Sequence, residues 1–183
     1  MPDNPINMDQ STLKEVYLKW DGTHIGHLKT LYQESIDDAS FIPHTIALLT
    51  AGKGVEVPGS WVVKHHVEQG NLLNTTQVDQ LVRCLGALHY WQAQLHLLQI
   101  IPMISLTEEQ AEHLEPVVRN HLSSDRAFVK ASAFAAYFEI VKFFPGLKNE
   151  FRLLSEDSLE KVSASVKVKI RRILNQLDGD KNK

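Results

Sequence analysis

The stretch that decides the fold runs over residues 107–146 and reads TEEQAEHLEPVVRNHLSSDRAFVKASAFAAYFEIVKFFPG. It opens with Thr107 and Gln110 at the spacing of a capping box, followed by an apolar face at Leu114, Val117 and Val118. After a short polar break at 123–125, a second apolar face recurs with a helical period: Phe128, Ala131, Ala135, Phe138 and Val141. The pattern predicts two helices joined by a short turn, which is an antiparallel helical hairpin.

Apolar residues recur with a helical period on both sides of this hairpin. Near the N-terminus, Thr12 and Glu15 have capping-box spacing and predict the start of a helix. The clearest stripe consists of Val78, Leu81, Val82, Leu85 and Leu88, and the last one of Val162, Val166, Ile170, Ile173 and Leu177. No segment alternates apolar and polar residues over a strand length, so we predict an all-α chain of antiparallel hairpins.

Composition excludes several classes of protein. The 183 residues are 43% hydrophobic and 22% charged, which excludes a disordered or fibrous chain. A net charge of −3 argues against a general nucleic-acid binder. Cys84 is the lone cysteine, the N-terminus lacks a secretory pattern, and no apolar run reaches the length of a membrane span. We therefore expect a soluble, cytoplasmic protein without a membrane partner.

Similar residues recur where helices are expected to open. The four segments are Trp61-Val62-Val63-Lys64, Tyr90-Trp91-Gln92-Ala93, Phe128-Val129-Lys130-Ala131 and Ser165-Val166-Lys167-Val168. Counted from Trp61, Trp91, Phe128 and Ser165, they lie 30, 37 and 37 residues apart. These spacings are typical of a loose two-helix repeat, in which each hairpin buries its apolar face against its neighbours.

The segment 116–133 resembles a HEAT repeat. Pro116 lies where that family has a proline in its first helix, and Asp125 where it has an aspartate at the turn. Val129-Lys130, Ala131 and Ala133 match the opening of its second helix, with Lys130 in place of the usual arginine. The resemblance covers residues 40–177 and implies an α-α superhelix, or HEAT-like α-solenoid, whose second helices line a concave face. It implies no particular activity, since members include transport adaptors, phosphatase scaffolds and a few DNA glycosylases.

The length of the chain predicts one domain over residues 1–183. N-terminal helices would occupy 1–39 and HEAT-like hairpins 40–160. A basic capping helix and tail would occupy 161–183.

Histidines are frequent, but their spacing gives no set of metal ligands. His24 and His27 share one helical face, as do His89 and His96, and no second cysteine or His-Glu-x-x-His motif accompanies them. Cys84 lies among apolar residues with no base on its face, which is typical of a core cysteine. We therefore expect no metal, no cofactor and no catalytic residue.

A weakly charged helix face is the best candidate for a binding surface. His89, Gln92, His96 and Gln99 follow one side of the helix that bears Trp91, and none carries a full charge. Tryptophans near the start of second helices either pack neighbouring hairpins together or line a groove. The candidate partner-binding residues are Trp61, Lys64, Trp91, Gln92, His96, Lys130 and Tyr137. The alternative is an ordinary solvated helix face.

Charge is distributed unevenly along the chain. Residues 161–183 carry a net charge of +5 and residues 1–160 a net charge of −8. The last helix is expected to have a basic edge that consists of Lys161, Lys169 and Arg172. An earlier helix is expected to have an acidic face that consists of Glu108, Glu112 and Glu115. The basic edge either caps the solenoid or contacts an acidic partner, RNA or DNA, and one hypothesis is that it meets the acidic face of another chain.

Taken together, these patterns favour a non-catalytic scaffold or adaptor that binds another protein. The alternative is a nucleic-acid-associated protein that binds through its basic C-terminal helix. A homo-oligomer is a third form of partnership that the charge pattern allows.

Overall fold

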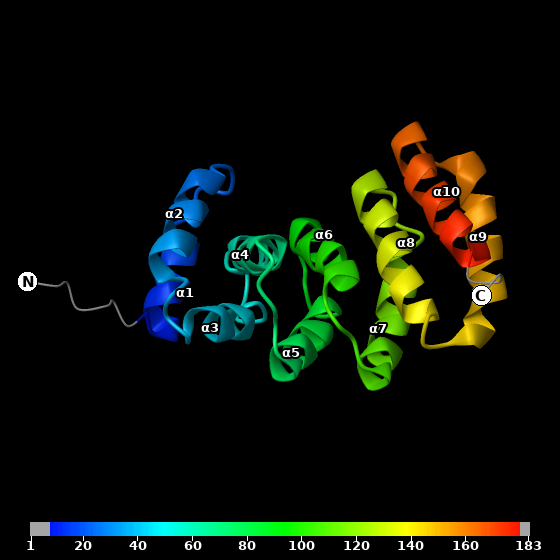
Figure 1. Ribbon diagram of the computed structural model, residues 1–183. Helices are drawn as coiled ribbons and strands as arrows, with labels where there is room; N and C mark the ends of the chain where they lie inside the picture. The colour runs from blue at the N-terminus through cyan, green and yellow to red at the C-terminus, as the bar shows by residue number, and fades with distance from the viewer. Residues whose placement is uncertain (1–7, 180–183) are drawn as a thin grey trace, which may run out of the picture. The chain divides into compact units, whose positions relative to one another are not determined.

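The computed structural model describes residues 8–179, and every regular element in that range is a helix (Figure 1). The elements are α1 (Gln10–Leu18), α2 (Ile25–Ser35), α3 (Phe41–Leu48), α4 (Glu56–Glu68), α5 (Thr75–Leu85), α6 (Trp91–Ile100), the 3-10 helix η1 (Ile101–Met103), α7 (Glu108–His121), α8 (Ala127–Val141), the 3-10 helix η2 (Pro145–Leu147), α9 (Lys148–Lys161) and α10 (Ala164–Gly179). The prediction of an all-α chain is confirmed for the described residues.

The chain divides into two compact units between Leu97 and Leu98, within the span of α6. The first unit contains α1 to α5 and most of α6. The second contains α7 to α10 together with both 3-10 helices.

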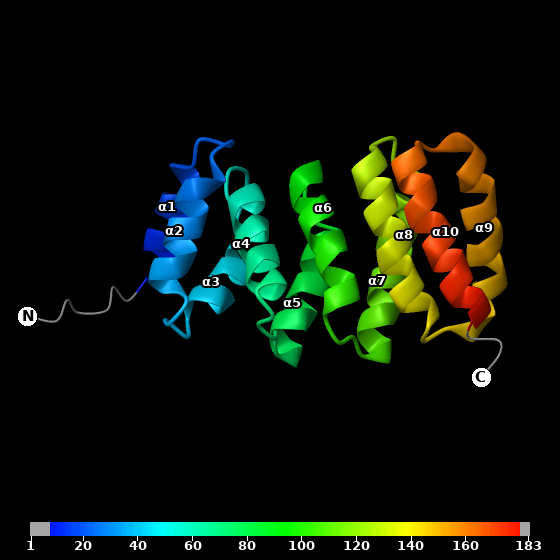
Figure 2. The same cartoon turned by 45° about the horizontal axis from the view of Figure 1, so that its top comes forward.

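In the first unit, α3 packs against α1, α4 and α5, while α2 packs beside α4 (Figure 2). The core between these helices includes the fully buried Leu13, Phe41, Ile46, Val62 and Val63. Inside it, the Tyr17 hydroxyl lies 2.8 Å from that of Thr45, which donates to the Phe41 carbonyl at 2.9 Å. These polar groups therefore enter the core with hydrogen-bond partners.

The second unit is organised around α8, which packs against α7 and α10 and touches α9 and η1. Apolar residues occur on nearly every side of this helix, and ten of its fifteen residues are buried. Phe134 and Tyr137 contact the ring of Phe151 from α9, with ring centroids 6.1 and 5.2 Å apart. A helix that is apolar all round is typical of a central core element.

The predicted apolar stripes differ in outcome. All five residues of the stripe from Val78 to Leu88 are buried. Phe128, expected on the inner face of its helix, is 72% exposed, because it lies in the first turn of α8 at the end of the helix. Val162 lies outside the last helix, which begins at Ala164.

Local capping decides where two of the predicted helices begin. Thr107 and Gln110 form the predicted capping box of α7. The box predicted at Thr12 and Glu15 is wrong, because the Asp9 carboxylate accepts the Thr12 N–H at 2.8 Å and α1 begins at Gln10.

α4 begins before Trp61, where the recurring residues predicted that a helix opens. Pro58 and Gly59 lie in the first turn of α4, where a proline is tolerated because its missing N–H would have no intrahelical partner. A Cβ on Gly59 would lie 3.1 Å from Leu49 Cδ2, so this glycine allows α4 to pack closely on the end of α3. As a result, α4, α6, α8 and α10 begin at Glu56, Trp91, Ala127 and Ala164, at regular intervals of 35, 36 and 37 residues.

The last helix begins later than predicted. Val162 adopts an extended conformation with φ −114° and ψ 162°, which ends α9 at Lys161, and α10 starts at Ala164. Lys161 therefore lies in α9, and the expected basic edge of Lys161, Lys169 and Arg172 is divided between two helices. The buried stripe of α10 consists of Val166, Ile170, Ile173 and Leu177.

Candidate functional site

The buried carboxylate of Glu56 connects α4 to the start of α6. Its side chain is 2% exposed and accepts the backbone N–H groups of His89 at 2.8 Å and Tyr90 at 3.0 Å. It also lies 2.9 Å from Nδ1 of His89. Glu56 thus supplies partners for N–H groups at the start of α6, which a helix cannot satisfy itself. Sequence reasoning missed Glu56, since its partners lie more than thirty residues away.

Four of the predicted binding residues lie on adjoining parts of α4 and α6. We call Trp61, Lys64, Gln92 and His96 the α4–α6 surface. Gln92 and His96 are one turn apart on α6, and Lys64 is one turn beyond Ser60 on α4. The Ser60 hydroxyl lies 2.9 Å from Nδ1 of His96, which holds the two helices in register.

His96 is neutral in this setting. Burial lowers the pKa of His96 to about 4, and the nearby Lys64 ammonium lowers that pKa further than the Glu68 carboxylate raises it. The Ser60 hydroxyl donates its single proton to the Val57 carbonyl at 3.0 Å, so Nδ1 of His96 carries the proton of their shared hydrogen bond. Lys64 is paired with Glu68 at 2.6 Å.

Trp61 forms an aromatic platform at the α2 side of this surface. Its indole stacks on the His65 ring at a centroid distance of 4.8 Å and an interplanar angle of 17°. The ring of Tyr32 from α2 packs edge to face against the same His65 ring, with the two ring centroids 4.9 Å apart. Trp61 and His65 remain partly exposed, so the platform presents an ordered apolar surface to a ligand.

Gln92 and Trp91, two further candidate binding residues, differ in their surroundings. Oε1 of Gln92 is buried and has no hydrogen-bond partner among the described residues. Trp91 is the first residue of α6 and is half-buried.

In the second unit, Tyr137 is not a surface residue. It was predicted to line a concave face but is 1% exposed. Its hydroxyl donates to Oε1 of Glu115 at 2.5 Å, and the Arg119 guanidinium lies 5.3 Å from its ring centroid. Burial first, and then the Glu115 carboxylate, raise the pKa of Tyr137. Tyr137 is therefore a core residue with a satisfied hydroxyl.

Arg119 joins α7 to α9 beside that tyrosine. Its Nε donates to Glu115 at 2.6 Å and its Nη1 to Glu150 at 2.5 Å. Lys130 and Arg119 both line a hollow of about 360 Å³, whose lining also includes the apolar side chains of Leu122 and Phe134. Lys161 lines the same hollow and pairs with Asp157 at 2.7 Å.

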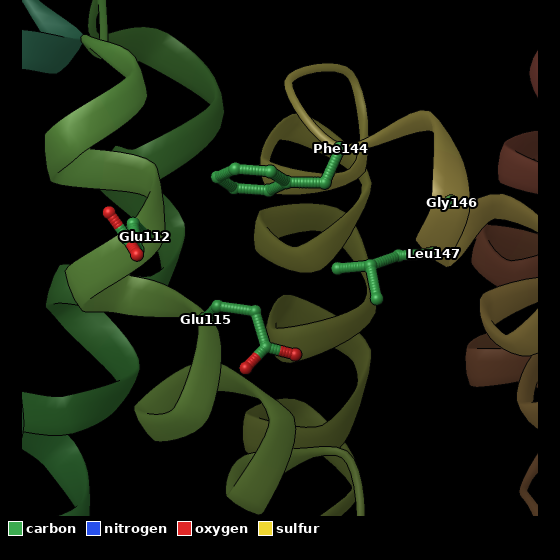
Figure 3. Close-up of a pocket in the computed structure, with 5 residues that line it drawn as sticks. All are labelled: Glu112, Glu115, Phe144, Gly146 and Leu147. Carbon is green, nitrogen blue, oxygen red and sulfur yellow. The ribbon is translucent and has the colours of Figure 1, made fainter.

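A second hollow, of about 370 Å³, lies between α7 and the connection from α8 to α9. We call it the acidic hollow, and it is lined by Glu112, Glu115, Phe144, Gly146 and Leu147. Figure 3 shows the ring of Phe144 and the side chain of Leu147 pointing toward the α7 glutamates. An apolar wall opposite carboxylates suits a ligand that is both apolar and cationic.

The basic residues of α10 are on the surface. Lys169 and Arg172 are exposed along one edge, while Arg171 is exposed and Lys167 partly exposed along the other. None of the four forms an ion pair with another residue in the described range. Between the two edges lies Val168, which is 59% exposed.

Within residues 8–179, no three His, Cys, Asp or Glu side chains converge as metal ligands would. Over the same range, no helix combines the length and apolar character that crossing a bilayer requires.

Comparison of the chain with protein-family models, curated proteins and solved structures finds no match. The resemblance to HEAT repeats therefore rests on the residues of the 116–133 segment alone.

Proposed function

We propose that the protein is a non-catalytic interaction module of HEAT-like type, which binds another protein through the α4–α6 surface. One observation supports the proposal: the hydrogen bond between Ser60 and His96 joins the helix that bears Trp61 and Lys64 to the helix that bears Gln92 and His96. The regular starts of α4, α6, α8 and α10 support a stacked arrangement of hairpins. The cytoplasmic location predicted from the lone Cys84 belongs to the same proposal.

The side chains of this surface and those buried beneath it suit recognition better than catalysis. Ser60, His96 and Glu56 are committed to hydrogen bonds within the chain. Trp61 offers a rigid ring held by His65, which is the kind of anchor that dominates protein interfaces.

The test is affinity capture with cross-linking, comparing wild type with Trp61→Ala. Phe128→Ala is the matched control, because Phe128 is a more exposed aromatic residue in the other unit. We expect Trp61→Ala to lose captured proteins that the wild type and Phe128→Ala retain. Circular dichroism verifies that both variants are folded. Identical captured sets for all three proteins would refute the α4–α6 surface as the binding site.

A second candidate function is binding of a nucleic acid by α10, favoured by its four cations that form no ion pair within residues 8–179. Such binding is expected to weaken as salt concentration rises, because Lys and Arg displace counterions from phosphates. Fluorescence anisotropy with labelled DNA and RNA, with and without the Lys169→Glu/Arg172→Glu substitutions, measures it. No change in anisotropy at low salt would remove this candidate.

A further inference from the structure

Two surfaces of the second unit have complementary chemistry. The acidic hollow combines the carboxylates of Glu112 and Glu115 with the apolar side chains of Phe144 and Leu147. Glu115 is already engaged by Arg119 and Tyr137, whereas Glu112 is exposed and has no ion pair among the described residues. Glu108, one turn before Glu112 on α7, extends the negative charge along the same side of the helix.

The complementary surface is the outer face of α10, which we define as Val168, Arg171, Arg172 and Asn175. All four residues are exposed. Arg171 and Arg172 lie one turn beyond Val168, so the valine and both cations share one patch. An exposed valine beside cations that form no ion pair in the described part of the chain matches the apolar and acidic walls of the hollow.

We propose that the acidic hollow receives the outer face of α10 from a second copy of this chain. Val168 of one copy lies between Phe144 and Leu147 of the next, and Arg171 and Arg172 face Glu112 and Glu108. The inference goes beyond the proposed function, since it concerns a different unit and a different partner.

The α10 of the same chain cannot fill its own hollow. It is held against α8 and α9 by the buried stripe on its opposite side. Arg152 of α9 also pairs with Asp178 near the end of α10, which fixes the helix in place. Filling the hollow from within would require α10 to leave the core of the second unit.

The two surfaces are different patches of one chain, so the contact is head-to-tail. Each bound copy still presents a free hollow at one side and a free α10 at the other, and assembly continues until a ring closes. Because the contact is largely electrostatic at its rim, we expect self-association to weaken at high salt.

Sedimentation velocity over a range of protein concentrations at low and high salt is the test. The wild type is expected to sediment faster as its concentration rises. Glu112→Lys and Arg171→Glu/Arg172→Glu should each raise the dissociation constant about tenfold or more. Val168→Ala should also weaken association, without any change in charge. Glu34→Lys, the same change of charge at an exposed position on α2, is the control and should behave as wild type.

Mixing the two charge variants makes the test specific to this pairing. Glu112→Lys retains a normal α10 and the arginine variant retains a normal hollow, so an equimolar mixture should associate where each variant alone does not. A wild type that stays monomeric at every concentration in low salt would overturn the proposal, as would variants that associate like wild type. Loss of nucleic-acid binding by the arginine variant, with its self-association unchanged, would overturn it in favour of a phosphate-binding α10.

Discussion

The Glu56 carboxylate accepts the backbone N–H of His89 at 2.8 Å, so a residue at the start of α4 caps the start of α6. A second N–H, that of Tyr90, shares the same oxygen. This relationship connects the start of α4 to the start of α6 through one buried carboxylate.

We expect Glu56→Ala to lower the free energy of unfolding by about 2–4 kcal/mol, because two partly buried N–H groups lose a charged acceptor. Glu56→Gln keeps an acceptor oxygen and should cost about 1 kcal/mol. Urea denaturation measures both, with the exposed Glu34→Ala as control. A Glu56→Ala variant as stable as the control would show that water replaces the carboxylate.

His96 should make the fold sensitive to acid. The folded pKa of about 4 lies below the ordinary 6.5, so the unfolded chain binds a proton between these values that the folded chain does not. The stabilisation is full above pH 6.5 and falls as pH decreases toward 4, by about 3 kcal/mol in total. His65, His66 and His121 contribute in the same direction, because burial lowers their pKa values too.

The measurement is the free energy of unfolding between pH 7 and pH 4, for wild type and His96→Asn. Asparagine retains an N–H donor toward Ser60 but does not titrate, so its curve should be flatter. Parallel curves for the two proteins would contradict this assignment.

Two fully buried serines should respond in opposite ways to substitution by alanine. Ser155 is 0% exposed, and its Oγ has no hydrogen-bond partner among the described residues. Ser60 is buried to the same degree but bonds to Val57 and His96. We expect Ser155→Ala to be neutral or stabilising and Ser60→Ala to cost about 1–2 kcal/mol. Thermal unfolding of the two variants measures the change in stability. Equal losses of stability would indicate that Ser155 has a water partner.

Tyr137→Phe should destabilise the protein by about 1–2 kcal/mol, since it removes the hydroxyl that donates to Glu115 while keeping the buried ring. Ultraviolet absorbance during an alkaline titration gives an independent reading. Burial and Glu115 raise the pKa of Tyr137, so its phenolate should form at a higher pH than that of free tyrosine in water. Normal titration of all tyrosines in the folded protein would contradict the buried assignment.

The sequence was sufficient to predict structure where the prediction depends on residues close together in the chain. The stripe from Val78 to Leu88 and the capping box at Thr107 depend on residues a few positions apart, and both were predicted correctly. The start of α4 was predicted too late, at Trp61, because the first turn of a helix tolerates Pro58 and Gly59. The start of α10 was predicted too early, because Val162 continues the apolar period across a break in the backbone.

Long-range pairings could not be predicted. Glu56 with His89, and Tyr137 with Glu115, are joined by tertiary packing that no local spacing reveals. Among the candidate binding residues, helical periodicity places Lys64 near Trp61 and His96 near Gln92, but the meeting of the two helices depends on the tertiary hydrogen bond between Ser60 and His96. The burial of Tyr137 also depends on tertiary packing, because predicting it requires knowing what α7 and α9 place over the ring.

The burial of α8 on nearly all sides determines where the sequence of this protein can accept substitutions and insertions. A helix covered on nearly all sides has no tolerant face, and one inserted residue would rotate everything beyond it by about 100° and move core side chains into the wrong contacts. The 70–74 connection, which includes an 89% exposed Leu72, carries no such constraint. Sequence differences and insertions among homologues should therefore occur mainly in the connections and outer helices, while the register of α8 stays fixed.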